Sequence, residues 1–166
     1  MENIVVQVAD PQWTNQAVHL ASAVARNTGR RVTLLYLMLA RNPGLLGSEI
    51  ATPPPTWEEQ TQFQGYSSIC EDYGVECVLQ PMQYVSQLGA LQDAAAILHA
   101  RVLFVKRPDK PLSLRNRFWA WSLRRGLQAT GCQLYLVDES TRMIDWIPAR
   151  VPSADFQHPI KADLLD

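Results

Sequence analysis

The stretch Ile4-Val5-Val6-Gln7-Val8, followed by Asp10-Pro11, decides the fold class of this chain. A short, mainly β-branched run that stops at a proline is typical of a buried strand. Directly after it, apolar residues recur at helical spacing over residues 17–24, and Gly29 stands where a helix C-cap is expected. A buried strand followed at once by an amphipathic helix predicts the first half of a β-α-β unit.

The same alternation continues along the chain. Further apolar runs predict strands at 32–38, 75–79, 101–105 and 132–137, and helical spacing predicts helices near 56–74, 88–98 and 113–129. Thr56 and Glu59 form a capping box at the start of the second helix. Strands that are apolar throughout and alternate with helices indicate a parallel sheet covered on both faces. We therefore expect one α/β domain in residues 1–140, with five parallel strands and helices on both faces.

Residues 141–166 form a C-terminal extension without sustained periodicity. It contains several large apolar residues, among them Trp146, Phe156 and Leu164, and a disordered tail would be poorer in such residues. We expect it to dock on its own domain, over the helix at 113–129 or across a dimer, or on a partner.

The composition limits the function. The chain has 166 residues, 47% of them hydrophobic and 19% charged, with a net charge of -1. A near-neutral molecule is not drawn as a whole to nucleic acid or to anionic membranes, and no apolar run is long enough to cross a bilayer. There is no basic leader segment, and the three cysteines have no CxxC spacing. We therefore expect a cytoplasmic protein without a disulfide framework.

The charge is concentrated in one segment. Residues 101–125 contain eight Lys and Arg residues against Asp109 alone. Such a cationic block predicts a local surface that selects anions. The alternative is a solvated face whose arginines pair with acids elsewhere in the chain.

The order of the segments resembles the universal stress protein family. The resemblance rests on Ile4–Val8 and the alanine-rich helix after it, on Val32–Leu37, on Ala100–Val105 and on the closing strand Cys132–Val137, and it covers about residues 2–139. It implies a flavodoxin-like, five-stranded parallel sheet. It also implies a homodimer through the last strand, 132–137. We expect this strand to be an edge of the sheet, with Leu134 and Leu136 as candidate interface residues. Many family members bind ATP, and some do not.

The nucleotide loop of the ATP-binding members is not present in its usual form. Those members have the pattern G-x2-G-x9-G-[ST] after the fourth strand, because glycines let backbone amides approach phosphate oxygens. Here no glycine occurs between Gly89 and Gly126, and Pro108 and Pro111 remove two amide donors. We therefore expect no tight binding of ATP or AMP. If an anion binds, the side chains of Lys106, Arg107 and Lys110 are the candidates to hold it.

The resemblance alone gives two more candidate nucleotide-binding residues. Asp10 lies one place after the position of the family's acidic residue at the end of the first strand, and Leu37 matches an apolar position near the nucleotide base.

No other pattern points to catalysis. The dinucleotide and P-loop fingerprints are missing, and His19, His99 and His158 have no second ligand at metal-site spacing. We expect no metal and no catalytic residue. We interpret the cysteines as small buried residues.

The helix at 113–129 has two different faces. Its inner face is predicted to contain the residues Trp119, Ser122, Leu123, Gly126 and Leu127. The opposite face combines aromatic residues and arginines, the composition of an interaction hot spot: Arg117, Phe118, Trp121 and Arg124 are its candidate interface residues. The alternative is that the extension covers this face.

The preferred hypothesis is a small universal-stress-like protein that acts by dimerising and binding a protein partner, without turnover. The alternatives are a nucleotide- or anion-responsive sensor that uses the basic loop, and a weak nucleotide hydrolase.

Overall fold

The computed structural model describes residues 2–40, 55–107, 114–137 and 145–146. The strands are β1 (Asn3–Gln7), β2 (Arg31–Leu39), β3 (Cys77–Tyr84), β4 (Ala100–Lys106), β5 (Gln133–Val137) and β6 (Asp145–Trp146). The helices are α1 (Pro11–Thr28), α2 (Trp57–Asp72), α3 (Gln87–Ile97) and α4 (Leu114–Gln128). The predicted alternation of strands and helices is confirmed.

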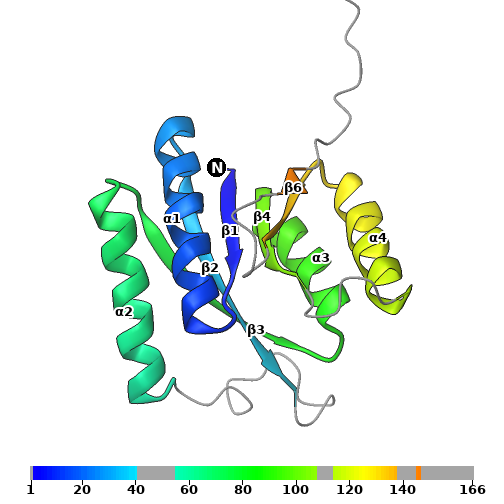
Figure 1. Ribbon diagram of the computed structural model, residues 1–166, viewed down its shortest axis with the longest axis horizontal. Coiled ribbons are helices and arrows are strands. Elements are labelled where there is room, and N and C mark those ends of the chain that lie inside the picture. The colour runs from blue at the N-terminus through cyan, green and yellow to red at the C-terminus, as the bar shows by residue number, and fades with distance from the viewer. Residues whose placement is uncertain (1, 41–54, 108–113, 138–144, 147–166) are drawn as a thin grey trace, which may run out of the picture.

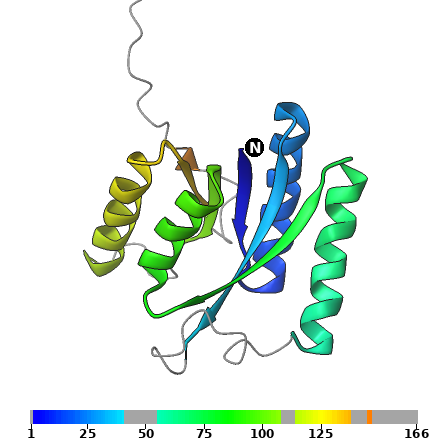
Figure 2. The same cartoon turned by 180° about the vertical axis from the view of Figure 1, so that it is seen from behind.

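The strands form one sheet in the order β3-β2-β1-β4-β5-β6, and β1 to β5 are parallel. Figures 1 and 2 show α1 and α2 on one side of the molecule and α3 and α4 on the other. After β3 the chain passes over the sheet and continues on the far side of β1 with β4. The carboxyl ends of β1 and β4 therefore meet at the point where the strand order reverses, which is the usual ligand position in open α/β sheets.

Each face of the sheet has its own core. Ile4, Val6 and Trp13 are buried in the cluster under α1 and α2, whereas Val5 and Leu103 are buried in the cluster under α3 and α4. Successive residues of a strand point to opposite faces. This explains why these strands are apolar throughout.

Local signals set the helix ends. Asp10 caps α1, with its Oδ1 accepting a hydrogen bond from the Trp13 amide at 2.9 Å. Gly29 ends the helix at φ 63°, in the left-handed region that favours glycine. The capping box of Thr56 and Glu59 is present at the start of α2.

Two features differ from the predictions. The strand predicted at 75–79 is observed as β3 at Cys77–Tyr84, and it continues past Pro81. β3 is an edge strand. In an edge strand, a proline whose backbone nitrogen faces away from the sheet removes no hydrogen bond between strands.

The expectation that residues 132–137 form an edge strand is corrected. The two residues of β6 pair antiparallel with Tyr135 and Leu136 of β5. They belong to the extension, whose other residues lie outside the described part of the chain. The described residues of the extension, Asp145–Trp146, therefore add a short strand to the sheet.

Candidate functional site

A cavity of about 890 Å³ opens at the carboxyl edge of the sheet, between the ends of β1 and β4 and the first turns of α3 and α4. Its lining is rich in polar and cationic side chains: Gln7, Ala9, Ser86, Gln87, Leu88, Lys106, Arg107, Arg115, Asn116 and Trp119. The strand-order reversal positions this cavity, because it leaves the connections after β1 and β4 on opposite faces of the sheet.

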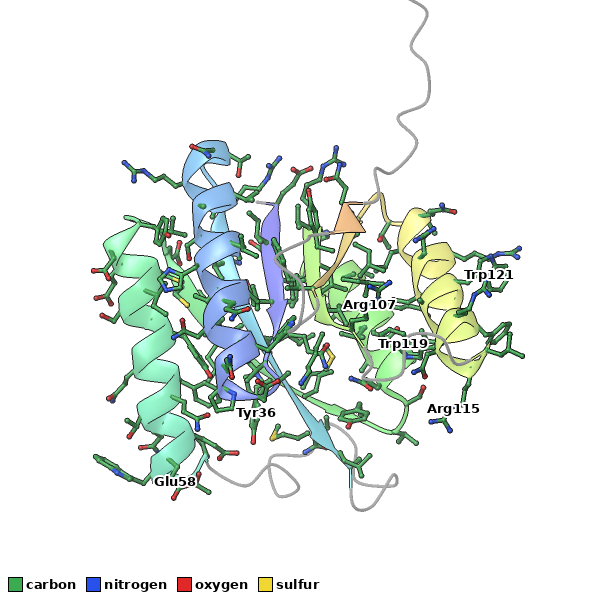
Figure 3. The ribbon with its side chains drawn as sticks, viewed as in Figure 1. Tyr36, Glu58, Arg107, Arg115, Trp119 and Trp121 are labelled. Atoms are coloured by element: carbon green, nitrogen blue, oxygen red, sulfur yellow. The ribbon has the colours of Figure 1, made fainter. Side chains whose placement is uncertain are left out.

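Three cations from two elements meet at the cavity. Lys106 is the last residue of β4 and Arg107 follows it, and the Arg107 amide is held by the Val137 carbonyl at 3.1 Å. Arg115 comes from the first turn of α4 and takes part in none of the ion pairs between described residues. In Figure 3, Arg107 and Trp119 lie between α4 and the sheet, and Arg115 lies at the start of α4. Cations converging on one cavity select an anionic ligand.

A buried amide adds a polar group to the same cavity. Gln7 lines it at the end of β1, with only 6% of the residue exposed, and its Oε1 has no hydrogen-bond partner in the described part of the chain. A buried acceptor without a partner costs free energy. Since this one lines a polar cavity, a ligand donor or a water in the cavity can satisfy it.

Asp10 and Lys106 are brought together. The Lys106 Nζ donates to Asp10 Oδ2 at 2.6 Å, while Asp10 Oδ1 caps α1. The pair joins the ends of β1 and β4. Asp10 itself is not among the residues that line the cavity, so its observed role is to cap α1 and to partner Lys106.

The other predicted ligand residues divide as follows. Lys106 and Arg107 line the cavity, and Lys110 lies outside the described residues. Leu37 packs against the core under α3 and α4 and does not line the cavity.

Sequence reasoning missed Gln7, Arg115 and Asn116 as cavity residues. A signal existed for Gln7, because it is the one polar residue in the run Ile4–Val8. Arg115 was counted only as part of the cationic block, since nothing in the sequence places α4 beside β4.

The outer face of α4 is exposed as predicted. Leu114, Phe118 and Trp121 are 81%, 66% and 52% exposed. The rings of Phe118 and Trp121 lie 5.6 Å apart, and the Arg125 guanidinium lies 5.4 Å from the Trp121 ring centroid. Figure 3 shows Trp121 on the side of α4 away from the sheet. Arg117 is exposed as well, whereas Arg124, assigned to this face, is half-buried.

Leu134 and Leu136 lie in the core under α3 and α4 and are 4% and 6% exposed. Because strand side chains alternate between faces, these two leucines point to their own helices and not to a second chain. Pairing through β5 would have to use its backbone.

Among the described residues, no group of three or more His, Cys, Asp or Glu side chains could hold a metal ion. Within the same residues, no helix has the length and hydropathy of a membrane span.

Comparison with solved structures identifies the fold. A universal stress protein in complex with cAMP superposes with a TM-score of 0.55 at 15% identity, covering 82% of this chain and 96% of that chain. A universal stress protein from Archaeoglobus fulgidus gives 0.53 at 15% identity, covering 83% and 93%. The Archaeoglobus fulgidus protein in complex with dAMP gives 0.51 at 17% identity, covering 75% and 90%.

No protein-family model matches the sequence, and no curated protein matches it. The likeness in structure shows the fold: the chain has the universal stress protein fold, as the sequence resemblance implied.

Proposed function

We propose that this protein binds a small phosphate-bearing ligand of nucleotide size in the cavity between β1 and β4. One observation carries the proposal, namely that Lys106, Arg107 and Arg115 line the same cavity at the strand-order reversal. Its volume of about 890 Å³ lies within the range of small-molecule sites. Two solved neighbours that share the fold are complexes with cAMP and dAMP, which supports a nucleotide as the first ligand to test.

The ligand would be held mainly by side chains. No glycine occurs between Gly89 and Gly126, so the glycine-lined amide cradle expected for tight ATP binding is missing from this stretch. Arginine guanidinium groups recognise phosphate through two parallel hydrogen bonds. We expect moderate affinity that falls with ionic strength, since salt screens exposed cations.

We propose binding without turnover. The described lining residues supply cations, amides and the Ser86 hydroxyl, but no carboxylate or imidazole that could act as a general base. We also place the protein in the cytoplasm, a location supported by its three free thiols.

Calorimetric titration with AMP and ATP at low and high salt tests the proposal. Arg115→Ala removes one cavity cation, and Arg117→Ala is the matched control because Arg117 is exposed on the same helix and does not line the cavity. We expect Arg115→Ala to weaken binding by about tenfold or more, the value of one charge-assisted hydrogen bond. Arg117→Ala should leave affinity within about twofold. Absence of binding at millimolar ligand, or equal losses in both variants, would contradict the proposal.

A second candidate function is protein binding through the outer face of α4, combined with dimerisation. The exposed Phe118–Trp121 pair with Arg125 beside it has the composition of a hot spot. Trp121→Ala should abolish capture of a partner, whereas Trp57→Ala, at an exposed tryptophan of α2, should not. Equal capture by both variants would contradict this candidate.

A further inference from the structure

Two cysteines that the sequence separates by a helix end and a turn lie together in the structure. Cys70 is in the last turn of α2, and Cys77 is the first residue of β3. The chain reverses between them, with Gly74 at φ 68° and the Val75 amide donating to the Cys70 carbonyl at 2.9 Å. Both side chains pack in the core under α1 and α2, close enough for each thiol to shift the pKa of the other.

The two thiols differ in access and in acidity. Cys70 is fully buried and also accepts a hydrogen bond from Ser22 Oγ at 3.4 Å, whereas Cys77 is half-buried. Hydrogen bonds from Cys77 and Ser22 lower the pKa of Cys70 below its usual value. The same thiol pair and burial raise the pKa of Cys77. Cys70 is therefore the thiol that gives up its proton, and Cys77 is the one that a small reagent can reach.

The third cysteine has a different environment. Cys132 lies in the core on the opposite face of the sheet, under α3 and α4. Burial raises the pKa of its thiol to about 12, so it stays protonated and unreactive. It provides an internal control.

We propose that Cys70 and Cys77 form a site of reversible oxidation, at which hydrogen peroxide produces an intramolecular disulfide between α2 and β3. The Cys77 sulfur passes its proton to the Cys70 thiolate and attacks one peroxide oxygen. The O–O bond breaks, and the leaving hydroxide takes the proton to become water, which leaves a sulfenic acid on Cys77. The Cys70 thiolate then attacks the Cys77 sulfur, and the S–O bond breaks. The second oxygen leaves as hydroxide and becomes water by taking from solvent the proton that Cys70 released when it ionised. The two thiols lose two electrons and two protons, and one peroxide becomes two waters.

The pair is independent of the ligand cavity. Cys77 begins β3 and so lies at the amino edge of the sheet, whereas the cavity is at the carboxyl edge. The disulfide would join the end of α2 to an edge strand. The disulfide would form whether or not the cavity holds a ligand, so the experiment uses none.

Mass spectrometry of the full chain tests it. The reduced native protein is treated with hydrogen peroxide, quenched, unfolded and alkylated. We expect a mass loss of about 2 Da before alkylation, for two hydrogens. Alkylation should then label one cysteine instead of three, and a thiol reductant should restore all three. Digestion after Glu71 and Glu76 places the two cysteines in separate peptides, so a linked peptide identifies the bond.

Variants and a denatured control complete the test. After peroxide treatment, the Cys132→Ser variant should lose about 2 Da, as the parent chain does. The Cys77→Ser variant, changed at the half-buried position, should show no such loss. Peroxide treatment in urea should give a mixture that includes bonds to Cys132, whereas the native protein should give the 70–77 bond alone. Three free thiols after peroxide, a sulfinic acid on Cys77, or a native bond to Cys132 or to a second chain would each overturn the proposal.

Discussion

At the scale of single residues, several side chains each hold two elements together. Asp10 caps α1 with one carboxylate oxygen and accepts from Lys106 of β4 with the other. Glu59 completes the capping box of α2 and accepts a hydrogen bond from the hydroxyl of Tyr36 in β2. Figure 3 labels Tyr36 on β2 and Glu58, the residue that precedes Glu59 in α2. Such residues fix where helices begin relative to the carboxyl edge that forms the cavity.

The Tyr36–Glu59 bond should make stability depend on pH. It lowers the pKa of Glu59 from 4.5 and raises the pKa of Tyr36 from 10.0 to about 12. The contribution of Glu59 is present above pH 4.5 and is lost as the pH falls through its lowered pKa. The contribution of Tyr36 is present below pH 10 and is lost as the pH rises towards 12.

Tyr36→Phe should therefore reduce the free energy of unfolding by about 0.5–1 kcal/mol near neutral pH, a value discounted for solvent exposure. The difference from the parent protein should shrink in acid and in strong base. Urea unfolding across the pH range measures it, and a difference that does not vary with pH would contradict the assignment.

At the scale of elements, α4 combines an inner face that stabilises the fold with an outer face that does not. Leu123 and Leu127 are buried, and Gln92 of α3 donates to the Ser122 carbonyl at 3.1 Å. A Cβ on Gly126 would stand 2.1 Å from Gln92 Nε2, so the glycine permits close contact between α3 and α4.

Two alanine substitutions separate these faces. Leu123→Ala should lower the free energy of unfolding by about 2–5 kcal/mol, because it leaves a cavity in the core. Phe118 lies on the outer face of the same helix and is 66% exposed, so Phe118→Ala should change the free energy of unfolding by at most about 1 kcal/mol. Chemical denaturation measures both, and similar losses would show that the outer face is covered in solution.

At the scale of the whole molecule, the sheet has two different edges. β3 forms one edge, where Pro81 cannot donate a ladder hydrogen bond. At the other edge, the two residues of β6 pair with Tyr135 and Leu136, and in the described part of the chain the rest of β5 has no strand partner on that side. Because a strand edge offers unpaired backbone groups, β5 remains the better candidate for two-fold pairing between chains.

We expect light scattering at tens of micromolar to give twice the chain mass of 18.7 kDa. A cysteine introduced at Gln133 of β5 should cross-link two chains, and one introduced at Gln80 of β3 should not. A mass of 18.7 kDa, or cross-linking at Gln80 alone, would contradict a dimer through β5.

The sequence by itself determined what depends on neighbours along the chain. Strand and helix alternation, the Thr56 capping box, the Gly29 terminus and the two faces of α4 were all predicted, because periodicity and capping bonds involve residues only a few positions apart.

Only the tertiary structure decided which distant residues meet. It placed Gln7, Lys106 and Arg115 around one cavity, set Cys70 against Cys77, added β6 beside β5 and turned Leu134 into the core. Strand order and register bring these groups together, and both are set by the packing of helices on the two faces of the sheet, which no local pattern encodes.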